Sequence, residues 1–205
     1  KIVKRGVTEL VTPGVAMNDD ILSAKTNNFL GAVFFNKEKV GVAFLDVSTG
    51  EYLTAQGDIA YVDKLLQNFA PSELLVCKKQ KKAFLEAYGS DYHTFYQEDW
   101  VFHIDYATES LHKHFDVNSL KGFGVEHLSE GVVAAGAALH YLGETQHHKL
   151  QHITRIRRIA ADDYVWMDRF TIRNLELYNS ASGVKAITLI DIIDKTTSAM
   201  GGRLL

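Results

Sequence analysis

The sequence has only one cysteine and two prolines among its 205 residues. A single cysteine cannot form a disulfide within the chain, which excludes the disulfide-rich secreted domains and favours a reducing, cytoplasmic location. We expect Cys77 to be buried in its apolar run rather than reactive. The longest nearly apolar run, Val132–Leu139, is far shorter than the roughly 18 residues of a membrane span. No signal segment opens the chain, so we expect no membrane association.

Catalytic signatures are missing as well. No glycine is followed by lysine, which excludes the phosphate loop GxxxxGK[ST] from this chain. The nucleophile elbow GxSxG is absent. Gly122-Phe123-Gly124 is a lone GxG that needs only a tight turn before a helix. We therefore predict no catalytic residue and no cofactor-binding residue, and we expect that this chain is not itself an enzyme.

The chain has no excess of positive charge: it contains 22 Lys and Arg and 25 Asp and Glu, which gives a net charge of −3. Stand-alone DNA-binding domains usually carry a basic excess. Of two local basic clusters, Lys78–Lys82 is interpreted as a solvated strand-to-helix junction, since no aromatic residue is interleaved to stack on bases. The second, Arg155–Arg158, lies near an expected domain junction, and its role stays open.

Histidine is comparatively frequent, with nine residues. Glu144, His148 and His152 are spaced at i, i+4 and i+8 along an expected helix. Their span of roughly 12 Å, at 1.5 Å per residue, is too wide for one ion. We therefore predict no metal site.

The hydrophobic pattern indicates an α/β fold with a mixed sheet. Residues 29–35 and 40–47 predict a hairpin, 51–55 a third strand, and Asp58 the N-cap of a helix that Pro71 ends. Further predicted elements are strands 74–77 and 93–96, a helix over 80–88 that Gly89 ends, a helix over 106–115, and a helix from about 126 to 146. Glycines within this last helix cost roughly 1 kcal/mol each relative to alanine, which predicts close packing against another helix or the sheet.

The C-terminal stretch Thr188–Leu205 predicts an amphipathic helix, with Leu189, Ile192 and Ile193 on one face. Ser198 can cap a second helix that has only just begun when the sequence ends. The first residue is Lys1 rather than methionine. We therefore expect this chain to be a piece of a longer protein.

Five stretches resemble, in the family's order, motifs of the MutS family of DNA mismatch-repair ATPases. They are Val11–Gly14 (VTPG), Leu45–Glu51 (LDVSTGE), Gly122–Glu126 with Ala134–Gln146 (GFGVE and AAGAALHYLGETQ), Met167–Leu177 (MDRFTIRNLEL) and Thr188–Leu205 (TLIDIIDKTTSAMGGRLL). The resemblance covers nearly the whole chain. It implies a ribonuclease H-like mixed sheet, with three antiparallel strands followed by βα units, and then an α-helical segment of a second, truncated domain.

The resemblance also implies a domain division and a role. Residues 1–17 would link to a missing mismatch-reading domain, 18–160 would form the connector domain, and 161–205 would begin the helical lever or core domain. This piece would be a non-catalytic connector that relays ATP state and docks a MutL-type partner. The full-length protein would be a homodimeric, DNA-dependent ATPase that uses ATP and Mg²⁺ and contacts mismatched duplex DNA through domains absent here.

We place the partner surface on the helix 106–115. Tyr106, Leu111 and Phe115 are expected to face the core. The residues left facing outward, and predicted to bind the partner, are Thr108, Glu109, Ser110, His112 and Lys113.

The alternative function is a metal-dependent nuclease of ribonuclease H type. Such enzymes hold two metal ions between clustered carboxylates, the first of which stands in the first strand. The predicted first strand, residues 29–35, has no acid. Asp46 and Glu51 flank the second turn, and Asp99 and Asp105 lie in later connections. We expect these acids to be scattered on a solvated surface.

Overall fold

A mixed six-stranded sheet, in the order β5-β4-β1-β2-β3-β6, is the centre of the fold. The computed structural model describes residues 12–15, 27–37, 39–146, 150–160, 167, 169–177, 187–198 and 201–202. Strands β1 (Phe29–Asn36), β2 (Lys39–Asp46) and β3 (Glu51–Gly57) are antiparallel neighbours. Strands β4 (Glu73–Cys77), β5 (Thr94–Gln97) and β6 (Arg157–Arg158) then add in parallel, the first two beyond β1 and the last beyond β3.

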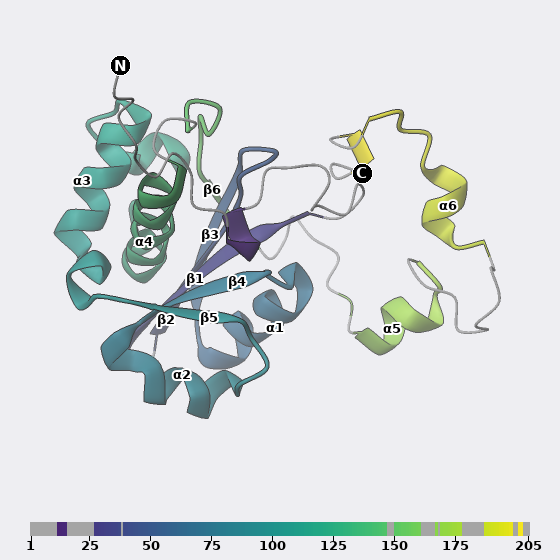
Figure 1. The fold of residues 1–205 in the computed structure, drawn as a ribbon, viewed down its shortest axis with the longest axis horizontal. Coiled ribbons are helices and arrows are strands. Elements are labelled where there is room, and N and C mark those ends of the chain that lie inside the picture. Colours follow the sequence, from purple (N-terminus) through teal and green to yellow (C-terminus); the bar gives the residue numbers. More distant parts are fainter. Residues whose placement is uncertain are drawn as a thin grey trace, which may run out of the picture. The chain divides into compact units, whose positions relative to one another are not determined.

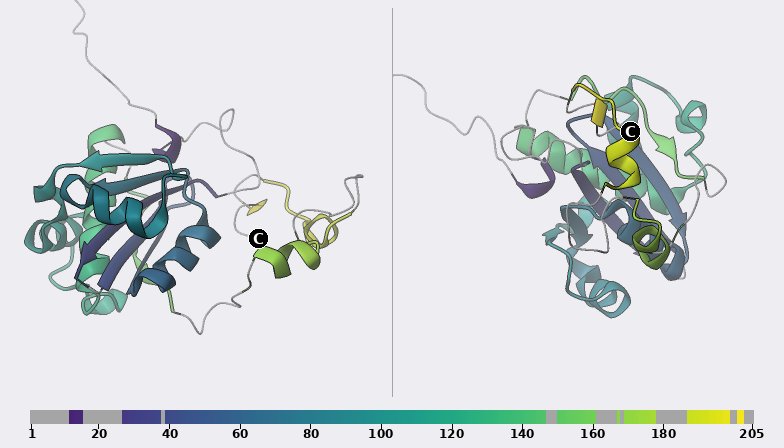
Figure 2. Two further views of the ribbon diagram at one scale, coloured as in Figure 1. Left: turned by 90° about the horizontal axis from the view of Figure 1, so that it is seen from below. Right: turned by 90° about the vertical axis from the view of Figure 1, so that its right-hand side faces the viewer.

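Helices cover both faces of this sheet (Figures 1 and 2). Helices α1 (Ile59–Phe69) and α2 (Lys81–Tyr88) pack on one face, and α3 (Ile104–Phe115) and α4 (Ser129–Gln146) pack on the other. Four short 3₁₀ helices complete the described connections: η1 (Pro13–Val15), η2 (Lys78–Gln80), η3 (Asp99–Phe102) and η4 (Leu120–Phe123). None of the helices in the described ranges is both long enough and apolar enough to cross a bilayer.

Alternation along the strands creates two apolar cores. In β1, Leu30 and Ala32 face the α3–α4 side, while Phe29 and Val33 face the α1–α2 side. Successive side chains of a strand point to opposite faces, so a strand covered on both sides is apolar almost throughout. This accounts for the nearly continuous apolar character of β1, β2 and β4.

Local signals set the helix ends. The Asp58 carboxylate accepts a hydrogen bond from the amide of Tyr61 at 2.7 Å, as an N-cap residue does. Gly89 closes α2 in a positive-φ conformation at +77°. Both were predicted from the sequence, as were the hairpin, β3, β4 and β5 to within two residues.

Helix α4 approaches the sheet and α3 through glycines. A Cβ atom on Gly41 of β2 would overlap the backbone of Glu130 and Gly131 in α4. Within α4, a Cβ on Gly131 would lie 2.8 Å from the Thr54 hydroxyl, and one on Gly136 would overlap Ala107 of α3. The Thr54 hydroxyl also donates a hydrogen bond to the Gly131 carbonyl at 2.9 Å. The predicted close packing of this glycine-containing helix is confirmed against both the sheet and a helix.

The chain divides into two compact units. The first, here called the sheet unit, contains η1 and Asn28–Ile159; the second, here called the helical unit, contains Asn27 and the residues from Ala160 onward. In the helical unit, α5 (Arg169–Asn174) and α6 (Leu189–Ile193) are described. A capping box joins Thr188 and Asp191 at the start of α6. The Ser198 hydroxyl accepts a hydrogen bond from the Gly201 amide at 3.1 Å, which agrees with the predicted cap.

Strand β6 was not predicted from the sequence, which placed its residues only near an expected domain junction. The strand has only two residues, both arginines with exposed side chains. Its place is set by β3, whose Leu53 and Thr54 are its partners about a hundred positions earlier in the chain. A strand of two residues is too short to show the alternation of apolar and polar residues from which strands are predicted.

We expect Gly136→Ala to destabilise the sheet unit by about 1–3 kcal/mol, because the new methyl group overlaps Ala107. Gly143→Ala is the matched control in the same helix, where an added Cβ meets no atom within 4 Å. That control should be neutral or stabilising by up to about 1 kcal/mol. Urea unfolding of the two variants measures the difference. Equal midpoints for Gly136→Ala and the unchanged chain would contradict the close packing.

Candidate functional site

A buried carboxylate holds η1 in place within the sheet unit. Glu73, at the start of β4, is 2% exposed. It accepts hydrogen bonds from the Thr12 hydroxyl (2.6 Å), the Gly14 amide (3.1 Å) and the Tyr141 hydroxyl of α4 (2.8 Å). Burial, together with the bond to Glu73, raises the pKa of Tyr141 to about 12, so this phenol remains a neutral donor. The arrangement fixes η1 against both β4 and α4.

Glu73 was not singled out from the sequence. The only local signal is an acid that immediately precedes an apolar run, and this pattern is also typical of a solvated strand end. Its donors come from positions 59 to 68 residues away in the chain. A buried carboxylate is tolerated when it is hydrogen-bonded in this way.

A second buried acid, Asp46, organises the turn between β2 and β3. One carboxylate oxygen accepts from the Ser48 amide (2.8 Å), the Ser48 hydroxyl (2.7 Å) and the Thr49 amide (3.3 Å). The other accepts from the Asn28 amide at 3.2 Å. Gly50 follows at φ +73°, where an added Cβ would lie 2.9 Å from the His152 carbonyl oxygen. The Leu45–Glu51 motif is therefore a structural turn.

Nothing in these acids supports the nuclease alternative. Strand β1 has no acid. Asp46, expected on a solvated surface, is instead buried, and its two oxygens already accept hydrogen bonds, one from the turn and the other from the Asn28 amide. Asp99 forms an ion pair with Lys79 and accepts from the Cys77 thiol, and these bonds lower the pKa of its carboxyl. Across the described ranges, no three His, Cys, Asp or Glu side chains come together as metal ligands.

The single cysteine, Cys77, is 4% exposed, as predicted. Burial raises the pKa of its thiol, with the hydrogen bond to Asp99 adding to the effect. A raised pKa keeps the thiol in its less reactive, protonated form.

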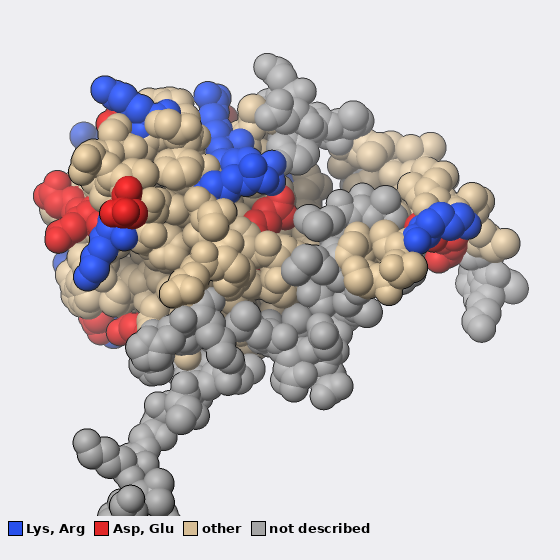
Figure 3. Space-filling view, turned by 90° about the horizontal axis from the view of Figure 1, so that it is seen from above, with Lys and Arg blue, Asp and Glu red and all other residues tan. Residues whose placement is uncertain are grey.

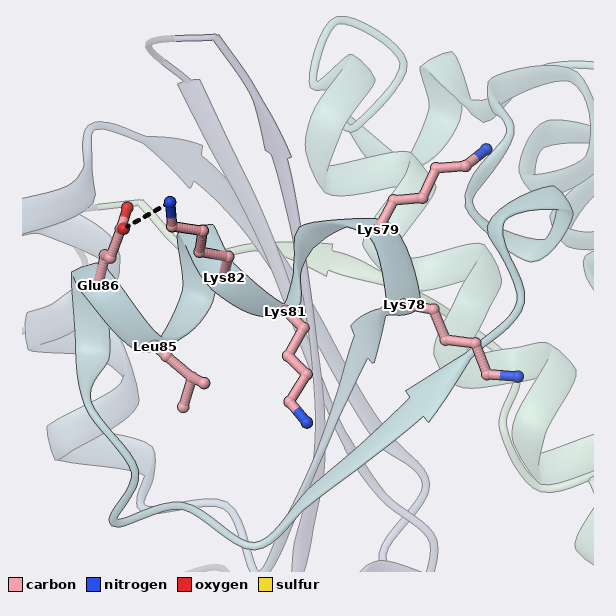
Figure 4. A pocket seen from close by; sticks show the side chains of 6 residues that line it. All are labelled: Lys78, Lys79, Lys81, Lys82, Leu85 and Glu86. Carbon is pink, nitrogen blue, oxygen red and sulfur yellow. Dashed lines mark ion pairs between the residues drawn. The ribbon is translucent and has the colours of Figure 1, made fainter.

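The lysine cluster at the end of β4 lines an open hollow of about 490 Å³ (Figure 4). Its four ammonium groups point in different directions. Lys78 pairs with Glu98, Lys79 with Asp99 and Lys82 with Glu86, and Lys81 lies 4.9 Å from the centre of the Tyr96 ring. Cations that are already matched by acids or a ring, and that do not converge, make a poor cradle for phosphate.

Two side chains of the arginine cluster likewise have separate neighbouring partners. Arg157 forms an ion pair with Glu51 at 3.3 Å, and the Arg158 guanidinium lies 3.5 Å from the His127 ring nitrogen. Figure 3 shows basic groups beside acidic ones on the face in view, without a continuous basic stripe across it. Glu144 and His152, two of the three residues spaced at i, i+4 and i+8, do not form a metal site among the described residues. The His152 ring contacts the Val47 carbonyl at 2.6 Å, and Glu144 lies beside His140. His148 lies outside the described residues.

The residues predicted to bind a partner all lie on α3. Glu109 and Lys113, one turn apart, are exposed, while Thr108, Ser110 and His112 are half-buried. The core side of the helix consists of Ala107 and Leu111, which are buried, with Tyr106 and Phe115 partly buried. The predicted core side contained Leu111 and the two aromatic residues but not Ala107, which packs against Gly136. Whether this helix binds a partner stays a prediction.

Comparisons with known proteins agree with the family that the sequence motifs resemble. The family described as MutS domain II matches residues 28–154, more than half of the chain. The chain belongs to the MutS domain II family. Relatives named DNA mismatch repair protein MutS are 67% identical over 204 residues in Christiangramia forsetii and 56% identical over 204 residues in Cytophaga hutchinsonii. A third, from Phocaeicola vulgatus, is 55% identical over 205 residues. Each match covers 100% of this chain but only 23–24% of the relative.

Further family motifs also make structural contacts among the described residues. Gly124 ends η4 in a positive-φ conformation at +71°, and Val125 is fully buried beyond it. The Gly122–Glu126 motif is thus a turn before α4 and not a phosphate cradle. In the helical unit, the amides of Leu189 and Ile190 donate to the carbonyls of Glu176 and Leu177 at 3.2 and 3.1 Å. These bonds join the two C-terminal motifs.

We expect Glu73→Gln to lower the stability of the sheet unit by about 1–3 kcal/mol, because an amide nitrogen replaces an acceptor where three donors converge. Glu86→Gln is the control, since the Glu86 side chain is 68% exposed on α2. Chemical denaturation of both variants measures the effect. If Glu73→Gln and Glu86→Gln unfold at the same midpoint, the buried carboxylate does not hold η1 in place.

Proposed function

We propose that this chain is a non-catalytic connector of a DNA mismatch-repair protein. The observation that carries the proposal is the MutS domain II match over residues 28–154, together with full-length relatives named for mismatch repair. The structural role of the motifs supports it, because Asp46, Gly124 and Gly136 build turns and packing contacts.

We propose that the sheet unit is ribonuclease H-like. The order β3-β2-β1-β4-β5, with three antiparallel strands followed by two parallel ones, supports this assignment. The helical unit is proposed to be the start of a lever or core domain. In support, it leaves several large apolar side chains 49–73% exposed, which further chain can cover: Phe170, Leu175, Ile187, Leu189, Ile192 and Ile193.

Within the full-length protein, the proposed role of the connector is to relay nucleotide state between ATPase and mismatch-reading domains. ATP, Mg²⁺, mismatched DNA and homodimer contacts then belong to other parts of that protein, which works in the cytoplasm. The chain spans about a quarter of the length of its relatives, which leaves room for those parts. The relay rests on the family resemblance and on the rigid packing of α4 against the sheet.

A MutL-type partner is proposed to dock on the exposed side of α3. Its exposed residues, Glu109 and Lys113, are polar and are presented by a helix that α4 holds in place through Ala107. Polar surfaces on rigid elements suit transient contacts, whose specificity and rate depend on charge complementarity.

In the full-length protein, Glu109→Arg with Ser110→Arg should weaken MutL recruitment to a mismatch, because it reverses the charge of the proposed contact. Mismatch binding and ATPase rates should stay unchanged. The control is Glu86→Arg with Asn68→Arg, the same change of charge at exposed positions of α2 and α1 on the opposite face. Surface plasmon resonance on mismatched DNA measures recruitment. Recruitment that survives the α3 change, or that falls equally with the control, removes α3 as the docking site.

A further inference from the structure

A small pocket lies at the edge of the sheet unit, between β5, η3 and α4. Its volume is about 200 Å³, and it is lined by Phe95 and Gln97 of β5, Trp100 of η3, and His140 and Glu144 of α4, among others. Pockets for drug-sized molecules measure roughly 300–1,000 Å³. This one has room for a single side chain rather than for a nucleotide. We call it the Trp100 pocket.

Two aromatic side chains on the pocket wall are unusually exposed. Trp100 is 54% and Phe95 is 44% exposed. The Trp100 ring is nevertheless held in place, with its centre 5.0 Å from both the Tyr106 and the His140 rings. Phe95 packs at 5.1 Å from Tyr141. A tryptophan that is fixed by its neighbours yet exposed is pre-organised for binding, and the face of its ring attracts cations.

The polar groups of the pocket are mostly acceptors. Gln97 is 5% exposed, and its buried side-chain oxygen has no hydrogen-bond partner. The Glu144 carboxylate is 62% exposed and lies 3.5 Å from His140. Burial lowers the pKa of His140 although Glu144 opposes the shift, so the imidazole is neutral at pH 7 and leaves the charge of Glu144 uncompensated.

The pocket has one cation of its own, Lys78, which forms an ion pair with Glu98. These two charges cancel. The remaining charge is that of Glu144, so the pocket as a whole is negative and rich in acceptors and aromatic surface.

We propose that the Trp100 pocket binds the side chain of an arginine presented by a partner protein. The planar guanidinium can stack on the Trp100 indole and still offer N–H donors to the exposed Glu144 carboxylate. The pocket adjoins β5, an edge strand of the sheet, along which an extended peptide can lie. This proposal goes beyond docking on α3 and holds whether or not α3 binds a MutL-type protein.

The test uses the ¹⁵N-labelled 205-residue chain and a blocked pentapeptide, acetyl-Gly-Gly-Arg-Gly-Gly-amide. The chain has two tryptophans, Trp100 and Trp166, whose indole N–H signals are assigned with Trp100→Phe. We expect the arginine peptide to shift the Trp100 signal in a saturable way and to leave that of Trp166 unchanged. The same peptide with citrulline, which keeps the shape but loses the charge, should bind at least about fivefold more weakly.

Variants locate the site. Glu144→Gln should weaken the binding of the arginine peptide at least about threefold, because the substitution removes the uncompensated negative charge. Glu86→Gln, at an exposed acid of α2 outside the pocket, should leave the affinity unchanged. Equal binding of the arginine and citrulline peptides, no shift of Trp100, or an unaltered affinity in Glu144→Gln would each overturn the proposal. A lysine peptide that binds as tightly as the arginine peptide would overturn the assignment to arginine.

Discussion

The close approach of α4 to the sheet is the constraint on which the rest of the sheet unit depends. Gly41 and Gly131 let backbone meet backbone where α4 begins, and Gly136 lets α3 lie directly against α4. Packing without intervening side chains fixes the helix in position along its length. Once α4 is fixed, the Tyr52 hydroxyl can donate to the Ala135 carbonyl, and Tyr141 can reach Glu73.

The same helix connects the functional proposals. Through Tyr141 and Glu73, it holds η1 in place. Through Ala107, it supports α3, and with His140 and Glu144 it forms one wall of the Trp100 pocket. The proposed connector role requires a unit braced in this way, because a relay between domains depends on a unit that moves as one body. Among the described residues, the family motifs fix turns and packing contacts.

The sequence predicted the elements whose signals are local. The hairpin, the Asp58 cap and the Gly89 stop depend on neighbours within a few residues. It could not predict β6, which exists because β3 offers an edge, or the buried role of Glu73, whose donors are distant in the chain. The Trp100 pocket was missed for the same reason, since Gln97 and Glu144 meet only in the folded unit.

The claim that the sheet unit is one rigid connector is tested most directly by native-state hydrogen exchange. The account predicts that the amides from Val132 to Leu142 in α4 exchange only through the opening that also exposes β2. Their free energies of opening should agree with those of β2 to within about 1 kcal/mol. If α4 exchanges through a separate opening of clearly lower free energy while β2 stays protected, α4 is not the brace of the unit and the rigid-connector account is contradicted.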